Sequence, residues 1–110
     1  MGVVYSKILL RNPRLPHLAV EVDALADTGS FYLCIPESIR AKLQLEVIDE
    51  NELLLADASV RKLPYAGPIE VRFKNRVAFT GAVVLGDEVL VGAIPMEDMD
   101  LVVLARTRTL

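Results

Sequence analysis

Short apolar stretches alternate with turn-forming residues along most of this chain. In the clearest stretch, residues 17–25, one side carries Leu18, Val20, Val22 and Ala24, and the other carries His17, Ala19, Glu21 and Asp23. A period of two is typical of a β-strand with one buried face. Pro, Gly, Asn or Asp follows most of the other apolar stretches as well. The pattern therefore predicts a series of short strands joined by turns.

The same pattern gives the expected bounds of the elements. Further strands are predicted over residues 3–10, 31–35, 45–48, 52–55, 60–63, 69–73, 77–85, 89–91 and 101–105. Residues 49–51 and 74–76 are predicted turns, and residues 56–59 are predicted to form the tip of a hairpin. Helical spacing predicts two short helices, over residues 37–43 after Pro36 and over residues 95–99. So many short strands indicate an all-β fold, a small barrel or sandwich in which the helices are minor features.

The composition fits one ordered domain that spans residues 1–110. Apolar residues make up 53% of the 110 residues and charged residues 25%, a balance that excludes a disordered chain. Aromatic residues make up 5% and Trp is absent, so the core must consist mainly of Val, Leu, Ile and Ala. The net charge of −3 argues against a nucleic-acid partner, because such binding needs clustered Lys and Arg. Arg72, Lys74 and Arg76 are therefore assigned to the solvated face of a hairpin rather than to a nucleic-acid patch.

Cys34 is the only cysteine, so no disulfide can form within the chain. This fits a reducing compartment, and we expect a cytoplasmic location. No apolar run approaches the roughly 20 residues of a membrane-spanning helix, so no membrane partner is expected.

Residues 25–30, Leu-Ala-Asp-Thr-Gly-Ser, are the most informative segment of the chain. An apolar strand leads here into an acid, a hydroxyl, a glycine and a second hydroxyl. Since all four of these residues favour turns, an ordinary turn is one interpretation. The other is a carboxylate presented for chemistry. In that case Thr28 can bond an opposing turn, Gly29 permits close approach of a peptide, and Ser30 can hydrogen-bond to the acid.

A carboxylate that serves as both acid and base needs a second carboxylate beside it. Two carboxylates held about 3 Å apart cannot both ionise, so they share a proton. The ionised group takes a proton from water, and the protonated group donates a hydrogen bond to the carbonyl under attack. The chain has only one Asp-Thr-Gly segment. If Asp27 acts in this way, its partner comes from a second copy of the chain.

The order of these segments resembles that of the retropepsin-like (retroviral-type, clan AA) aspartic peptidases, and specifically their small stand-alone microbial members. The resemblance covers nearly the whole chain and rests on three segments: Leu25-Ala26-Asp27-Thr28-Gly29-Ser30, Leu55-Ala56-Asp57-Ala58-Ser59 and Val89-Leu90-Val91-Gly92. It implies a mainly β fold, a small closed barrel of the acid-protease type with one or two short helices. It also implies a homodimeric aspartic endopeptidase with one catalytic Asp27 in each chain and no metal or cofactor.

The resemblance further implies roles for the neighbouring residues. Thr28 would interlock with Thr28 of the second chain, while Gly29 and Ser30 support the catalytic turn. Val91 and Gly92 would lie on the strand behind that turn. The tip of a flap that closes over an extended peptide substrate would consist of Ala56, Asp57, Ala58 and Ser59.

Two features depart from the family pattern. The flap tip is usually rich in glycine, whereas Ala58 stands where a glycine is expected, and a positive φ costs more for alanine. The viral enzymes also carry an acid soon after Asp-Thr-Gly and an arginine after the later glycine. Phe31 and Ala93 stand near those two positions. We therefore expect dimer contacts unlike the viral ones, and the mobility of the flap is open.

Other candidate sites have less support. His17 and Cys34 are a conceivable thiol–imidazole pair, but residues 31–35 are typical of core. With one histidine in the chain and no ligand-like spacing, a metal site is not expected. The acids that such a site would need are more typical of helix ends and surface: Glu97, Asp98 and Asp100.

Three functions follow from these observations. The first is a homodimeric aspartic endopeptidase that acts on peptide or protein substrates. The second is a catalytically inactive retropepsin-fold module for dimerisation or peptide binding, since a fold does not fix a function. The third is a small nucleic-acid-binding barrel, which the acidic charge and scarce aromatics oppose.

Overall fold

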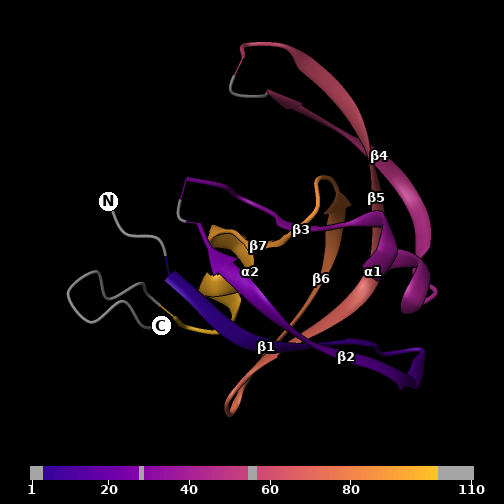
Figure 1. Cartoon of the computed structure of the whole chain (residues 1–110), viewed down its shortest axis with the longest axis vertical. Helices are drawn as coiled ribbons and strands as arrows, with labels where there is room; N and C mark the ends of the chain where they lie inside the picture. The colour runs from indigo at the N-terminus through magenta and orange to yellow at the C-terminus, as the bar shows by residue number, and fades with distance from the viewer. Residues whose placement is uncertain (1–3, 28, 55–56, 102–110) are drawn as a thin grey trace.

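The computed structural model describes residues 4–27, 29–54 and 57–101. The strands of this part of the chain are β1 (Val4–Asn12), β2 (Leu15–Ala26), β3 (Leu33–Ile35), β4 (Glu46–Leu54), β5 (Val60–Phe73), β6 (Arg76–Val84) and β7 (Val89–Val91). The helices are α1 (Glu37–Lys42) and α2 (Ala93–Asp98). Figure 1 shows these elements in place.

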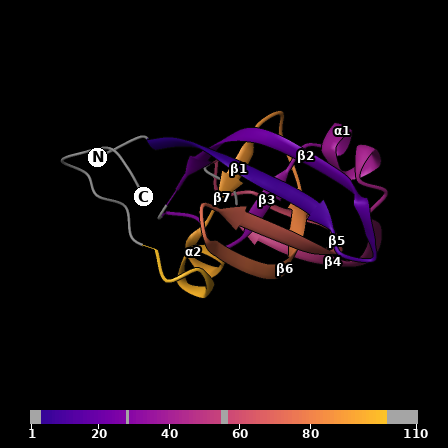
Figure 2. The same ribbon diagram turned by 90° about the horizontal axis from the view of Figure 1, so that it is seen from below.

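The strands form one sheet that closes on itself. Their order is β1-β2-β7-β3-β6-β5-β4, and β1 also pairs with the second half of β5. The strands from β1 to β5 in this order therefore make a ring, while β4 pairs with the first half of β5 on the same edge. Figure 2 shows the ring from below. The expected fold class, a small, mainly β closed barrel with two short helices, is confirmed.

The core lies inside the ring and is mostly aliphatic, as the composition predicts. In β2 the alternation is as expected: Ala24 and Ala26 are buried, while Glu21 and Asp23 are exposed. The pairing of β2 with β1 and β7 turns this strand's buried face toward the centre. Core side chains come from almost every element and include Leu10, Ile35, Leu43, Ile69, Val71, Val91, Met96 and Met99.

Strands β4 and β5 are longer than the sequence pattern predicts. Residues 49–51, a predicted turn, continue β4 and pair with residues 63–65. The prediction of two separate strands over residues 60–63 and 69–73 is also wrong, because β5 runs without interruption through residues 64–68. Pairing across the hairpin outweighs the local turn preference. A bulge at Ile48 and a register shift between Ala66 and Ile69 accommodate the irregular residues.

The segment after Asp27 is less buried than predicted. Only Leu33–Ile35 of the predicted strand over residues 31–35 forms β3, and Phe31, which was expected in the core, is 70% exposed. The carbonyl of Phe31 accepts a hydrogen bond from the N–H of Ile94 at 2.9 Å. This contact holds the backbone against the start of α2 while the side chain points to solvent.

The two helices occur where helical spacing predicts them, with small differences in their bounds. Helix α1 follows Pro36, and Leu43 after it is buried while Ala41 is exposed. Helix α2 begins at Ala93, earlier than predicted. Most of the predicted strand over residues 101–105 lies outside the described residues. Neither helix of the described chain has the length and apolar character needed to cross a membrane.

Candidate active site

Asp27 lies at the end of β2, where the strand gives way to a turn. Asp27 is half-buried. The residue before it, Ala26, pairs with Val91 of the parallel strand β7. The N–H of Asp27 donates to the carbonyl of Val91 at 2.9 Å. Strand β7 thus fixes the backbone at the residue that carries the carboxylate.

The turn after Asp27 holds the carboxylate as well. The N–H of Gly29 donates to Oδ1 of Asp27 at 2.9 Å, and the N–H of Ser30 donates to the carbonyl of Asp27 at 3.2 Å. A side-chain oxygen that accepts from the backbone two residues later is typical of an Asx-turn. The orientation of the carboxylate is therefore set by its own turn. Thr28 lies outside the described residues.

The backbone at Gly92, behind the Asp27 turn, is packed so closely against the backbone of residues 31–32 that no side chain fits there. Strand β7 lies between β2 and β3, and Gly92 follows it. The N–H of Gly92 donates to the carbonyl of Tyr32 at 3.1 Å, and the N–H of Ala93 donates to that of Ser30 at 2.8 Å. A Cβ at Gly92 would lie 2.5 Å from the carbonyl oxygen of Tyr32. Only glycine permits this approach of two backbones.

Cys34 lies close to this turn and is 3% exposed. Burial raises the pKa of its thiol, a hydrogen bond with Ser30 opposes the rise, and the charge of Asp27 adds to it. The thiol is thus a protonated, packed group beside the carboxylate. His17 is exposed near the opposite end of β2, so the thiol–imidazole pair considered from the sequence does not form.

One face of the sheet connects Asp27 to the β4–β5 hairpin, and sequence reasoning missed it. Successive strands place five side chains in direct register across β2, β7, β3, β6 and β5: Leu25, Leu90, Cys34, Val83 and Tyr65. We call this side the Asp27 face. Leu63 and Tyr32 pack against the same group of side chains. Side chains alternate between the two faces of each strand. With the strand pairing known, this alternation would have identified the residues of the Asp27 face from the sequence.

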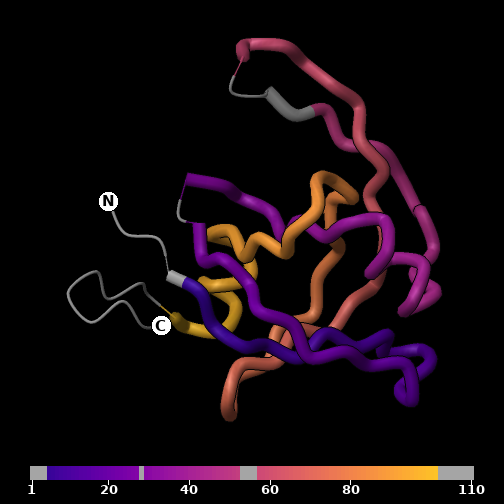
Figure 3. The backbone as a smooth tube through the Cα atoms, viewed as in Figure 1, coloured from indigo at the N-terminus to yellow at the C-terminus, as the bar shows by residue number. Residues whose placement is uncertain are grey.

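The hairpin of β4 and β5 extends beyond the ring and arches over the side where the turn after β2 lies (Figure 3). At its tip, the N–H of Ser59 donates to Oδ1 of Asp57 at 3.0 Å. A hydrogen bond from the Ser59 hydroxyl, and after it this backbone hydrogen bond, lower the pKa of Asp57. Ala58 has φ of 69°, the left-handed conformation that the sequence analysis considered costly for alanine. Ala56 lies outside the described residues.

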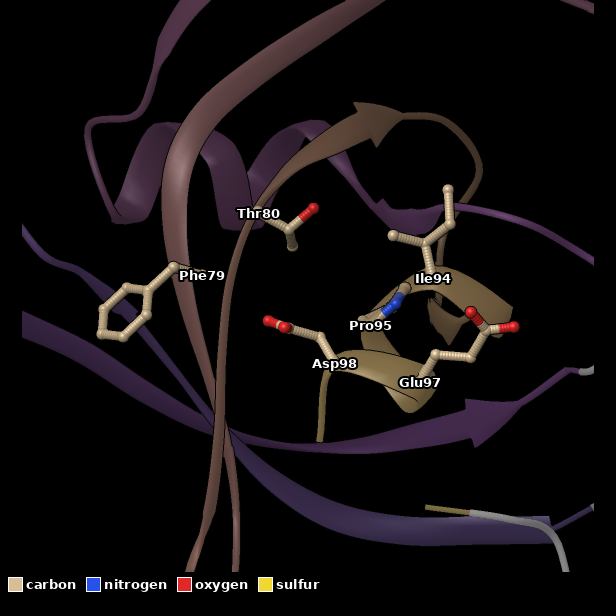
Figure 4. Close-up of a pocket in the computed structure, with 6 residues that line it drawn as sticks. All are labelled: Phe79, Thr80, Ile94, Pro95, Glu97 and Asp98. Carbon is tan, nitrogen blue, oxygen red and sulfur yellow. The ribbon is translucent and has the colours of Figure 1, made fainter. Parts of the chain in front are cut away.

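An open hollow of about 450 Å³ lies elsewhere, between β6 and α2 (Figure 4). Its lining consists of Phe79, Thr80, Ile94, Pro95, Glu97 and Asp98. Asp100, the third acid considered for a metal site, pairs instead with Arg76 at 3.5 Å. Within the described residues, no three His, Cys, Asp or Glu side chains form a group that could hold a metal ion.

Comparisons with known proteins find similarity in structure but not in sequence. No family model matches the chain, and no curated protein matches it at a significant level. The EIAV protease in complex with the inhibitor HBY-793 is similar with a TM-score of 0.71 at 11% identity, over 94% of this chain and 93% of that one. The simian foamy virus (mac) protease has a TM-score of 0.52 at 12% identity, over 84% and 92%.

A bacterial protein has a similar structure too. Lpg0085 of Legionella pneumophila, of unknown function, has a TM-score of 0.51 at 10% identity, over 90% of this chain and 87% of that one. Identities this low show the fold alone. The chain has the fold of the retroviral proteases, as the resemblance of its three segments implied.

Proposed function

We propose that this chain is one subunit of a homodimeric aspartic endopeptidase in which the two copies of Asp27 form the catalytic pair. The proposal combines the retroviral-protease fold with the single Asp-Thr-Gly turn of the sequence. One chain supplies one such carboxylate, and the reaction needs two.

The way Asp27 is held is the observation that carries the proposal. Its backbone is bonded to β7, and its Oδ1 accepts from Gly29. Asp27 is half-buried, so part of it stays accessible to solvent. A catalytic group needs such fixed geometry, because small displacements of reacting atoms cost much of the rate.

The proposed chemistry uses one water and no covalent intermediate. Two carboxylates that face each other share a proton. The ionised one accepts a proton from the water as that water attacks the peptide carbonyl, and the protonated one donates a hydrogen bond to the carbonyl oxygen. The substrate would lie extended beneath the β4–β5 hairpin and add a strand to it.

The decisive experiment combines one substitution with dilution. Asp27→Asn keeps the size of the side chain but cannot serve as a base, so peptide cleavage should fall to background. Wild-type specific activity should also fall on dilution, as dimers dissociate, in step with the mass measured by sedimentation. The matched control is Asp23→Asn, which changes an exposed acid of the same strand that pairs with Lys7.

Mixing the two proteins tests whether both copies of Asp27 are needed. In an equal, fully exchanged mixture of wild type and Asp27→Asn, half of the wild-type chains lie in mixed dimers, so activity per wild-type chain should fall to about half. Unchanged activity per chain, or cleavage by Asp27→Asn alone, would contradict the proposal.

The alternative is a non-catalytic module of the same fold that binds peptides or dimerises. The specific observation in its favour is Ala58, because a strained alanine at the hairpin tip opposes a freely adapting flap. A dimer that binds peptides yet cleaves none of a broad library, at acid or neutral pH, would support this alternative.

A further inference from the structure

Two tyrosines form a corner on the Asp27 face. The ring centroids of Tyr32 and Tyr65 lie 6.3 Å apart with an angle of 74° between the planes. The ring of Tyr65 lies against Gly81 of β6, where a Cβ would come within 2.5 Å of the Tyr65 hydroxyl oxygen. Because Gly81 has no side chain, the ring of Tyr65 can lie on β6. The ring of Tyr32 lies beside it, steeply inclined to its plane.

The neighbouring strand β4 carries an acid on the same face of the sheet as this corner. Asp49 of β4 is the direct cross-strand partner of Tyr65, so the two side chains project from the same face of the sheet. Its neighbour Glu50 pairs with Pro64 and projects from the opposite face. The corner therefore has two aromatic sides, and the strand beside Tyr65 carries an exposed carboxylate on the same face, whose Oδ1 accepts from the N–H of Glu50 at 2.8 Å.

We propose that Tyr32, Tyr65 and Asp49 form a binding site for a cationic side chain, Lys or Arg, of the peptide substrate. The inference rests on the proposed peptidase function and adds a substrate class to it. Aromatic faces attract a cation that approaches within about 6 Å of the ring, and a nearby carboxylate adds charge attraction. An apolar side chain would gain the contact with the aromatic rings but no attraction to the carboxylate.

The position of the corner sets how far the basic residue lies from the cleaved bond. Between Asp27 on β2 and Tyr65 on β5 the sheet crosses β7, β3 and β6. Four strand spacings of about 4.8 Å give roughly 19 Å along the sheet. An extended peptide advances about 3.4 Å per residue. The basic residue should therefore lie within about six residues of the bond that is cleaved.

The competing explanation is packing alone. Tyr32 and Tyr65 cover the buried side chains of Cys34 and Val83. If this were their whole role, removing a ring would change cleavage of all peptides alike. A binding role predicts a change in the preference between peptides.

The test uses synthetic peptides that differ at a single position, which carries Lys, Arg, Leu, Phe or Glu in turn. At one position within reach, Lys and Arg should raise kcat/KM over Leu by about 3- to 30-fold. Tyr65→Leu and Asp49→Asn should each lower that ratio, whereas Tyr65→Phe should keep it. Glu50→Gln, on the opposite face, and Phe79→Leu, an exposed aromatic beside α2, are the matched controls and should leave the ratio unchanged.

A binding measurement separates this inference from the proposed function. Fluorescence anisotropy of the same labelled peptides with Asp27→Asn reports recognition without cleavage. Peptides cleaved with no basic preference, or with one that survives both Tyr65→Leu and Asp49→Asn, would overturn the corner and leave the peptidase standing. If the wild type never cleaves but binds basic peptides preferentially, and this preference depends on Tyr65, the peptidase function would be overturned and the binding site would stand. If Tyr65→Leu fails to fold, the ratio for Asp49→Asn decides.

Discussion

The turn at Asp27 and the tip of the β4–β5 hairpin share one local motif in two very different surroundings. In both, Oδ1 of an aspartate accepts from the N–H two residues later, at 2.9 Å from Gly29 and 3.0 Å from Ser59. The first turn is bonded to β7 and to the start of α2. The second is exposed on all its described side chains. A short sequence motif therefore determines the turn, and the tertiary contacts determine whether it is fixed.

In the proposed enzyme the difference would suit a division of labour between two parts. One is the floor, which is the Asp27 turn with β7, β3 and Gly92 beside it, and the other is the flap, which is the β4–β5 hairpin. A carboxylate that must meet its partner at a fixed distance needs a backbone that does not move. A hairpin that admits and covers a peptide needs few tertiary contacts, since loosely packed segments open at low free-energy cost.

Gly92→Ala should be the most destructive single change in the floor. Its Cβ would lie 2.5 Å from the Tyr32 carbonyl oxygen and 2.6 Å from the Phe31 carbonyl carbon, so backbone would have to move. We expect a loss of more than about 3 kcal/mol in the free energy of unfolding, measured by urea denaturation at fixed protein concentration.

Gly86→Ala is the control for Gly92→Ala. Gly86 has φ of +75° but no atom within 4 Å of its Cβ position, so alanine there meets strain without a collision. Its cost should be only about 1 kcal/mol. Equal costs at the two glycines would show that the backbone behind Asp27 is less rigid than the contrast requires.

Gly81→Ala should have an intermediate effect on stability. Gly81 lies on β6, against the ring of Tyr65 from the β4–β5 hairpin. A Cβ at Gly81 collides with the ring of Tyr65, which is a side chain and can swing away. We expect a loss of about 1–3 kcal/mol, seen as a fall in Tm of about 4–8 °C for each kcal/mol. Stability reduced as far as in Gly92→Ala would show that Tyr65 cannot move.

The sequence predicted the alternating strand β2 and the Asp27 turn correctly because both depend on neighbours in the chain. It was wrong at residues 49–51 and 64–68, where pairing between β4 and β5 outweighs turn-forming residues. Phe31 was misplaced for a similar reason, since the contact of its backbone with Ile94 turns the side chain outward. Local propensity carries no information about such pairings.

The Asp27 face shows the same limit for the candidate site. Cys34 on β3 is far in the sequence from Val83 on β6 and Leu90 on β7, and only the register brings the three side chains into line. Gly81 had no local signal for its role, because the ring that needs its space belongs to another strand. The sequence points to Asp27 as the candidate carboxylate, but it does not show the surface around it.

Cys34→Val tests whether water is excluded from the buried thiol of Cys34 beside Asp27. Because burial raises the pKa of the thiol above its ordinary value of 9.0, the unfolded chain loses this proton at lower pH than the folded chain. Below the unfolded pKa the full stability is present, and it falls as the pH rises through the folded value. Valine should cost less than about 1.5 kcal/mol at neutral pH and remove this alkaline loss.

Urea midpoints for wild type and Cys34→Val at about pH 7 and about pH 10 measure the effect of the thiol, because the other alkaline groups are common to both proteins. The wild type should lose more stability over this interval than the variant. Parallel losses would place the thiol in contact with water and weaken the view of the floor as a sealed layer.

Ala58→Gly should have the smallest effect on stability. Glycine relieves a left-handed conformation that costs an alanine about 1–2 kcal/mol, but it orders a more flexible residue at a cost of about 0.5–1 kcal/mol. The net change should stay below about 1 kcal/mol, within a few degrees of Tm. Since the tip makes its hydrogen bond between Asp57 and Ser59, this change leaves the rest of the molecule untouched.

Hydrogen exchange gives the sharper reading of this variant. Faster exchange at Ser59 with unchanged exchange at Gly29 would mean that the two turns move independently, as their different tertiary contacts require. If exchange at Gly29 rose as well, the tip and the Asp27 turn would be coupled through the Asp27 face. Floor and flap would then form one cooperative unit, and Ala58 would restrain the carboxylate as well as the hairpin.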